Sequence, residues 1–312
     1  MKKSSLFCGI VIFLLLASER CLSQKTSRNS DFEIDISGGR MQDAFNWSIA
    51  GYTTDNTYIN ILSELAWKNL KSNEILIAGS YRFKDKLLVR AIFSKASIYD
   101  GTVSDTDFQK SNRKDAVYSG VFESNDGQLL SYGLTGGYCI SLTDNISITP
   151  FIGYGAASQE LYISEDKGPA NLNLQSTYDA RWLGYKVGFE MEFAIGKKLN
   201  LLNRFTYNQI DYSADANWNL IDVFQHPVSF THKSKGFGIV PEVIIGYSLT
   251  PFLKATLRGQ FSYWNTGEGE DKLFLQNGQV LSTPLNKVER KSKGISIGLS
   301  VNLGRLLEHK QE

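Results

Sequence analysis

The feature that most constrains this chain is an alternation of apolar and polar residues, which recurs in long segments between residues 32 and 303. In the stretch 75–93, apolar residues stand at every second position on both sides of an interruption at 84–86. A period of two is that of a β-strand with one apolar face, and two such strands across a tight polar turn form a hairpin. The same pattern along the rest of the chain predicts about ten antiparallel strands.

The connections between these segments alternate between very short turns and longer polar stretches. The short turns lie at 84–85, 143–145, 196–198 and 250–251, and the longer stretches lie near 51–57, 109–127, 165–178, 218–229 and 265–292. Short turns at one end and long loops at the other are typical of an up-and-down barrel in a bacterial outer membrane. An even number of strands places both chain ends with the short turns, on the periplasmic side.

The polar faces of the segments carry charges of both signs in near balance. They are Arg82, Arg90, Lys186, Glu190, Glu192, Arg204, Glu242, Lys254 and Arg258. A narrow barrel interior filled with paired charges accounts for this balance, whereas a soluble barrel or sandwich gives no reason for the alternating connections. We therefore predict an all-β fold: a transmembrane antiparallel up-and-down β-barrel of about ten strands, with long extracellular loops.

The first residues have the form of a secretory signal peptide, with two lysines before an apolar run that is too short to span a membrane. We predict a signal peptide over 1–23, the outer-membrane barrel over 24–304 and a periplasmic tail over 305–312. Removal of the signal peptide leaves Cys139 without a partner, so no disulfide is expected. The chain has 33 Lys+Arg against 32 Asp+Glu, which gives no electrostatic footprint for nucleic acid.

Three stretches resemble the omptin family of outer-membrane proteases, and the likeness runs from about Asp31 to Leu303. They are LAWKNLKSNEILIAGSYRF at 65–83, SDTDF at 104–108, and the segment from Leu199 through FTYNQIDYSADANWN to residue 219. The turn YSLTP at 247–251 adds to the likeness. The resemblance implies a ten-stranded, vase-shaped barrel with a proteolytic site in an extracellular groove.

In that family an Asp pair faces an Asp–His pair, and a water held between them attacks the peptide bond. Asp105 and Asp107 match the first pair. An ungapped alignment from Leu199 places the second pair on Asn217 and Asn219, with Asp215 two positions before the first of them. Because neither Asn can act as a base or carry a charge, the resemblance implies that the proton-transfer machinery is absent.

Another histidine could rebuild the second pair. His232 has the inward parity of its segment, His226 lies in a predicted loop, and His309 lies in the tail. The alternative is that His226 and His232 are an ordinary loop residue and an ordinary interior residue.

Asp105 and Asp107 also have a simpler interpretation, as loop carboxylates or a weak cation site. Counted from Val89 they fall on the lipid side, so their site requires a one-residue shift, for which Asp100-Gly101 is a plausible bulge. Bulges are also expected at Pro150 and Pro241, where each proline removes a ladder donor.

The family resemblance implies lipopolysaccharide as a lipid partner, although the expected contacts after Gly153-Tyr154 are replaced by Ala156, Ala157 and Ser158. No other cofactor and no metal is expected.

We expect an omptin-like outer-membrane barrel with absent or altered endopeptidase activity, which acts through its extracellular loops at the cell surface. One alternative is an active omptin-type aspartic endopeptidase with a rearranged Asp/His site. Others are an adhesin, and a small pore, which the charged interior disfavours. The expected partners are outer-membrane lipid and a peptide or host-surface ligand at the loops, and the expected state is a monomer.

Overall fold

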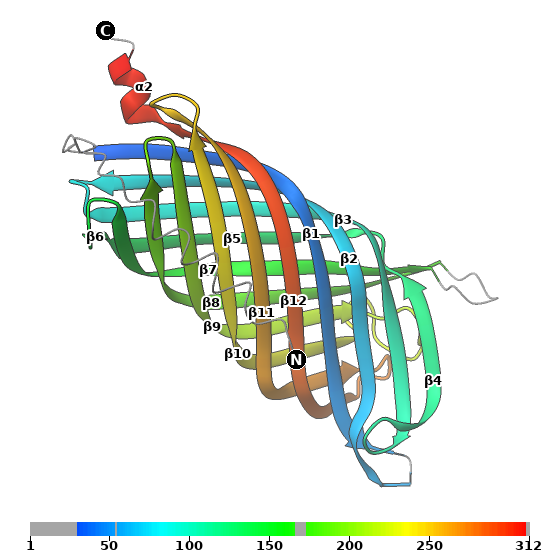
Figure 1. Cartoon of the computed structure of the whole chain (residues 1–312). Coiled ribbons are helices and arrows are strands. Elements are labelled where there is room, and N and C mark those ends of the chain that lie inside the picture. The colour runs from blue at the N-terminus through cyan, green and yellow to red at the C-terminus, as the bar shows by residue number, and fades with distance from the viewer. Residues whose placement is uncertain (1–29, 54, 166–172, 310–312) are drawn as a thin grey trace, which may run out of the picture.

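The computed structural model describes residues 30–53, 55–165 and 173–309, so the predicted signal peptide lies outside the described residues. The chain forms strands almost throughout, followed by one short helix (Figure 1). The elements are β1 (Ser30–Tyr52), β2 (Tyr58–Phe83), β3 (Leu87–Lys110), β4 (Lys114–Glu123), β5 (Gly127–Tyr138), β6 (Ile140–Ser141), β7 (Ile146–Glu165), β8 (Asn173–Ile195), β9 (Leu199–Asn217), β10 (Phe230–Ser248), β11 (Leu253–Phe274), β12 (Val280–Asn302) and α2 (Leu303–His309). No helix among the described residues is long and apolar enough to cross a membrane.

The strands close into a ring in which each strand is antiparallel to the strands beside it. β1 pairs with both β2 and β12, and β2 pairs with β3, which joins the two ends of the sheet. β4, β5 and β6 are successive pieces of one wall strand, because β4 and β5 share one register against β3, and β5 and β6 share one register against β7. Because three of the twelve strands are pieces of a single strand of the barrel wall, the wall has ten strands. This confirms the predicted barrel.

The outer face of the barrel is apolar over a continuous band. On β2 and β3 it exposes residues of the stretch that shows the alternation most clearly, among them Ile75 (61%), Ile77 (45%) and Val89 (48%). Tyrosine and phenylalanine side chains such as Tyr81, Phe83, Phe93, Tyr132, Tyr185 and Tyr247 are exposed on the same face. An exposed apolar band with aromatic residues is the outer surface of a membrane-spanning barrel, so the strand alternation is apolar outside and polar inside.

The interior at the level of this band is filled by ion pairs. Arg204 lies 2.7 Å from Glu190 and 3.0 Å from Glu242, and Arg258 also contacts Glu242. Further pairs join Arg90 to Asp35, Arg290 to Asp43, and Lys254 to Glu33. The prediction of a narrow interior filled with paired charges is therefore confirmed.

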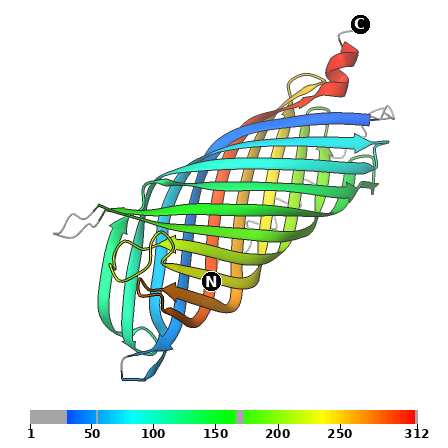
Figure 2. The same ribbon diagram turned by 180° about the vertical axis from the view of Figure 1, so that it is seen from behind.

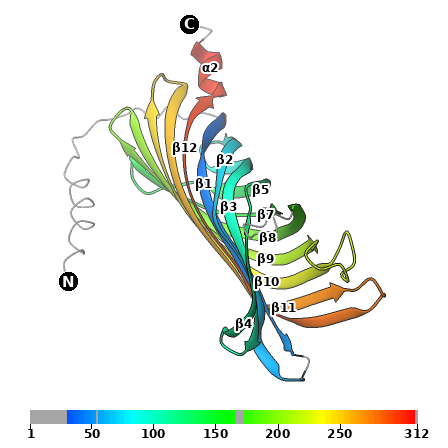
Figure 3. The ribbon, with the colours of Figure 1, turned by 90° about the vertical axis from the view of Figure 1, so that its right-hand side faces the viewer.

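The longer polar stretches are mostly strand rather than irregular loop. Residues 265–292 form the outer part of the β11–β12 hairpin, whose turn spans only 275–279. Residues 109–127 contain the end of β3, the turn that follows it, the whole of β4 and the link to β5. We call the end that carries these hairpins the mouth. Figures 2 and 3 show the hairpins projecting from this end, whereas α2 and the short turns lie at the opposite end.

The ladder is irregular at one of the three predicted places. β2 and β3 shift register around Lys71, opposite Asp100, and the buried positions of β3 change from even numbers (Ala96, Ile98) to odd numbers (Val103). The bulge predicted at Asp100-Gly101 is therefore present. The bulges predicted at Pro150 and Pro241 are wrong, because the register is the same on both sides of each proline, although Pro150 pairs only with β8 and Pro241 only with β9 among the described strands.

Candidate functional site

The acid pair of the family resemblance lies at the mouth, on β3 above the bulge. The register shift turns Asp105 inward, where it is paired across the ladder with Leu65 of β2 and Gly120 of β4 and is only 6% exposed. Its Oδ1 has no hydrogen-bond partner among the described residues. A carboxyl group in this position is shielded from water without full hydrogen bonding.

Burial, and to a lesser extent the nearby charge of Asp107, raise the pKa of Asp105 to about 8, although a hydrogen bond from the backbone N–H of Thr106 acts in the opposite direction. Burial also raises the pKa of Asp107, which a hydrogen bond from Ser63 partly offsets. At neutral pH Asp105 is therefore mostly a protonated acid beside a second carboxyl group.

The positions predicted for the other half of the site do not face this pair. Asp215 is exposed on the outer face of β9, because its neighbours Ala214 and Ala216 are the buried residues of that strand. The Asn217 Oδ1 lies 2.8 Å from His226 Nδ1, and Asn219 donates through its backbone N–H to Ser176. The structure therefore brings none of these three together with Asp105.

His232 takes part in a different Asp–His pair, which the sequence analysis did not find. His232 on β10 and Asp271 on β11 are direct cross-strand partners, and Nε2 lies 3.2 Å from Asp271 Oδ1, although that nitrogen is not aligned for a hydrogen bond. The other ring nitrogen, Nδ1, lies 2.7 Å from the hydroxyl of Tyr178. The His232 side chain has no solvent exposure.

The hydrogen bonds continue on both sides of this pair. The Tyr178 hydroxyl lies 2.7 Å from that of Tyr212 on β9, and Thr283 on β12 donates to the second carboxylate oxygen of Asp271 over 2.7 Å. Burial raises the pKa of both tyrosines well above the ordinary range. The chain of polar groups therefore links five neighbouring strands, β8 to β12, and Tyr178 of β8 stands between Tyr212 of β9 and His232 of β10. We call Tyr212, Tyr178, His232, Asp271 and Thr283 the mouth network.

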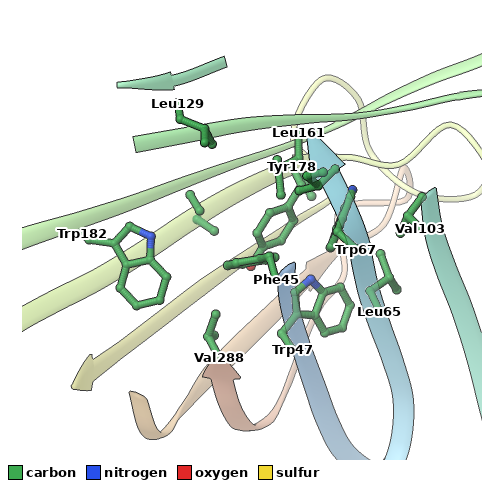
Figure 4. Close-up of a cluster of buried hydrophobic side chains, with 14 of the residues drawn as sticks. Phe45, Trp47, Leu65, Trp67, Val103, Leu129, Leu161, Tyr178, Trp182 and Val288 are labelled. Atoms are coloured by element: carbon green, nitrogen blue, oxygen red, sulfur yellow. The ribbon is translucent and has the colours of Figure 1, made fainter. Parts of the chain in front are cut away.

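An aromatic layer packs against the mouth network, and Figure 4 shows Phe45, Trp47 and Trp67 close to Tyr178. The ring of Trp47 stands edge-on to His232 at a centroid distance of 4.7 Å, and Phe45 packs against Trp67 and Tyr178 at 5.5 Å each. Other members of the layer are Trp182, Tyr212, Trp218, Phe230 and Trp264. Where the family resemblance implies an open groove, this chain has a packed hydrophobic core.

A cavity of about 160 Å³ separates the aromatic layer from the ion pairs below. Its lining includes Trp264 and Leu129 on the aromatic side and Arg204, Glu242 and Arg258 on the charged side. A polar space of this size holds several water molecules.

A second hollow, of about 1100 Å³, runs across the outer wall from β5 to β11. Its outward-facing lining combines apolar Tyr132 and Leu183 with charged Arg181, Lys233 and Glu270. The hollow therefore mixes an apolar floor with both signs of charge, just beyond the apolar band.

Asp271, Tyr178 and Tyr212 were missed because each interacts across strands that are far apart in sequence. The inward parity of Tyr212 and Tyr178 is visible in the alternation of their strands. The inward parity of Asp271 is not, because β11 changes parity between Thr266 and Asp271, where its register with β10 also shifts.

Comparison with known proteins supports the fold and a family. The structure is similar to the outer-membrane protease OmpT from Escherichia coli, at a TM-score of 0.70 and 15% sequence identity, covering 89% of this chain and 98% of that one. Weaker matches are OprG from Pseudomonas aeruginosa (TM-score 0.36, 9% identity, 88% and 97% covered) and the translocator domain of NalP from Neisseria meningitidis (0.40, 7%, 87% and 88%). A search of curated proteins finds no match.

At 15% identity, the likeness to OmpT is one of fold. One family model matches nearly the whole barrel. It is the model of the Protochlamydia outer membrane protein family, Pom, and it matches residues 35–303. That span begins within β1 and ends just beyond β12. The chain is an outer-membrane β-barrel that belongs to the Pom family.

Proposed function

We propose that the protein is a non-proteolytic outer-membrane barrel that acts through the hairpins of its mouth, which lie outside the cell. The observation that carries this proposal is the burial of His232. A general base must present a nitrogen to the attacking water, but Nδ1 of His232 contacts Tyr178, Nε2 faces Asp271, and the ring is not exposed.

The other mouth histidine also lacks the setting of a general base. His226 is exposed in the β9–β10 connection, but its Nδ1 contacts the amide oxygen of Asn217. An amide cannot stabilise the imidazolium that forms during general-base catalysis as a carboxylate does. The filled interior argues in the same way against the small pore.

Cleavage of a dibasic fluorogenic peptide tests the proposal. The full chain is refolded in detergent, lipopolysaccharide is added, and release of the fluorophore is followed for the wild type and for Asp105→Asn, His226→Ala and His232→Ala. We expect no cleavage by any of the four proteins. Cleavage by the wild type that disappears in Asp105→Asn would instead establish the endopeptidase alternative, and its loss in only one histidine variant would identify the base.

Conductance in planar bilayers tests the pore. We expect no stable conductance steps, since ion pairs and aromatic rings occupy successive levels of the interior. Reproducible steps with the wild type would favour a pore over a surface-acting barrel.

Lipopolysaccharide is retained as a proposed lipid partner, on the family resemblance and on the outer hollow. Arg181 and Lys233 are cations beside the apolar Leu183 there, which suits an amphiphile with anionic groups. The measurement is binding of lipopolysaccharide to the wild type and to the Arg181→Ala/Lys233→Ala double variant, with Lys71→Ala, an exposed lysine outside the hollow, as control.

A further inference from the structure

Asn203 of β9 is the one amide side chain in the lipid-facing band of the described strands. Every other outward position of the band carries an aliphatic, aromatic, methionine, glycine or proline residue. Counted in steps of two, these outward positions are 32–38, 75–83, 87–93, 132–140, 146–156, 183–195, 199–207, 237–249, 253–263 and 295–301. No outward position of the band, as far as the structure describes the chain, carries a charge.

The outward direction of Asn203 follows from the residues around it. Arg204 and Thr206 are the buried residues of this part of β9, so the odd-numbered positions face outward. Asn203 is paired across the ladder with Met191 of β8 and with Val243 of β10, and Val243 is 45% exposed. Directly paired residues of neighbouring strands point to the same face of a sheet, so Asn203 faces the lipid.

Asn203 also lies near the middle of the membrane span. It is four positions from Leu199, which follows the short turn, and four positions from Tyr207 at the other end of the span. A transmembrane strand has about 9–11 residues, so this amide lies at the level of the hydrocarbon and not of the headgroups.

Lipid cannot satisfy an amide at this depth. In the part of the chain that the structure describes, no hydrogen bond reaches the Asn203 side chain. Hydrocarbon offers neither a donor nor an acceptor, so an unpaired amide there costs free energy. A polar residue that faces lipid in the middle of a membrane therefore points to a contact with another protein surface.

A second copy of the chain carries the group that satisfies this amide. The oxygen of an asparagine side chain accepts and its nitrogen donates, so two such side chains can form reciprocal hydrogen bonds. Two barrels inserted in the same direction can be related by a two-fold axis along the membrane normal, and a residue next to that axis meets itself. A side chain that only donates or only accepts could not pair with itself in this way.

The surface around Asn203 suits such a contact. Phe189 of β8 and Phe205 of β9 lie with their ring centroids 6.0 Å apart, and both rings are exposed on the outer face. Pro241 of β10, which is paired with Phe205, is also exposed there. Because these three strands carry no charge on the outer face at this level, two copies can meet there without removing a charge from water.

We propose that two copies of the chain associate in the membrane through β8, β9 and β10, with the two Asn203 side chains hydrogen-bonded to each other across the two-fold axis. The result is a parallel dimer, with both mouths on the same side of the membrane, in place of the monomer expected from the sequence. The inference does not depend on the proposed function, because it concerns the wall inside the membrane and not the mouth.

Sedimentation equilibrium of the refolded full chain in density-matched detergent micelles measures the dissociation constant of the dimer. We expect Asn203→Leu to weaken the dimer at least about tenfold, the size of one hydrogen bond between polar side chains inside a membrane. Asn203→Gln keeps the amide and is expected to retain most of the wild-type affinity. The matched control is Ile77→Leu on β2, at the opposite side of the ring, which is expected to change nothing.

A disulfide between two copies locates the axis. Asn203→Cys and, as control, Ile77→Cys are made in a chain that carries Cys8→Ser, Cys21→Ser and Cys139→Ser, and each is oxidised with copper phenanthroline in lipid vesicles. We expect a covalent dimer from Asn203→Cys and not from Ile77→Cys. Circular dichroism and heat-modified mobility in gels check that every variant is folded, and replacing a lipid-facing amide by leucine removes no contact that folding needs.

Three results would overturn the inference. The first is a wild type that stays monomeric at every ratio of protein to detergent. The second is an Asn203→Leu variant that dimerises as strongly as the wild type, since association would then need no amide. The third is equal cross-linking at positions 203 and 77, which would mean random collisions and no defined face.

Discussion

The interior of the barrel is filled in two different ways, by ion pairs at the level of the apolar band and by aromatic rings at the mouth. Arg204 shows the first way, with two carboxylates within 3.0 Å. His232 shows the second, with rings on several sides and a single weakly aligned acidic partner. Both regions are inward faces of the same strands, so the difference lies in residue choice and not in topology. Charges close the middle of the barrel, and rings close its mouth.

Breaking the charged region is expected to have the largest effect. Arg204→Ala leaves Glu190 and Glu242 buried without their shared cation, and loss of one partner of a buried pair costs about 3–5 kcal/mol of unfolding free energy. Urea titration of the refolded protein, followed by tryptophan fluorescence, measures the loss. The matched control is Lys71→Ala, which breaks an exposed pair with Asp100 and is expected to change little. An Arg204→Ala protein as stable as that control would show that the ion pairs do not stabilise the barrel.

A change of pH is expected to act at the mouth through Asp105. Its pKa in the folded protein is raised from 3.8 to about 8, so the neutral acid is the form that folding favours. Asp105 therefore contributes its full share to the free energy of unfolding at a pH below 3.8, and this contribution is lost progressively as the pH rises towards about 8.

Asp105→Asn removes this titration, so the free energy of unfolding of the variant is expected to rise relative to wild type as the pH rises. The expected gain near pH 8 is about 1–3 kcal/mol, which is the cost of a buried polar group with poor hydrogen bonding. Urea titrations across this pH range measure the difference. The matched variant Asp215→Asn, on the exposed outer face, is expected to give a flat difference. A flat difference for Asp105→Asn as well would mean that the carboxyl group is hydrated.

The smallest effect is expected from a single hydroxyl of the mouth network. Tyr178→Phe keeps the ring that packs on Phe45 but removes the oxygen between His232 and Tyr212, at an expected cost of about 1 kcal/mol. Urea titration measures this cost, and Tyr207→Phe, which loses an exposed hydrogen bond to Gln209, is the control. Equal effects in the two variants would indicate that the aromatic packing alone holds the mouth closed.

Much of the barrel can be predicted from the sequence because a membrane imposes a strict alternation. Ile77 and Val89 have to meet lipid and Arg204 has to face inward, so a period of two identifies both faces and the number of wall strands. The same reasoning correctly located the bulge at Asp100-Gly101, since a one-residue shift between Val89 and Asp105 is needed to turn Asp105 inward. It failed at Pro150 and Pro241, because a strand can lose one donor and keep its register.

The mouth could not be predicted in the same way. Whether His232 meets Asp271 depends on the register of two strands above the membrane, where the alternation shifts and no lipid enforces it. The aromatic layer draws its rings from strands that are distant in the chain, such as Phe45 of β1 and Tyr178 of β8. The local pattern shows only that each residue faces inward, and it does not show which of them share one layer.

The bulge beside Gly101 has a consequence for how the gene can change. Below it, the even positions of β3 face the interior, and above it the odd positions do. A one-residue deletion that removes the bulge would present the mouth residues of this strand in the wrong phase, with Asp105 towards the outside and Thr106 towards the aromatic layer. Substitutions here change one contact at a time, but a length change would exchange the two faces of a whole strand end. The length of this segment should therefore vary far less among descendants of the chain than the identity of its side chains.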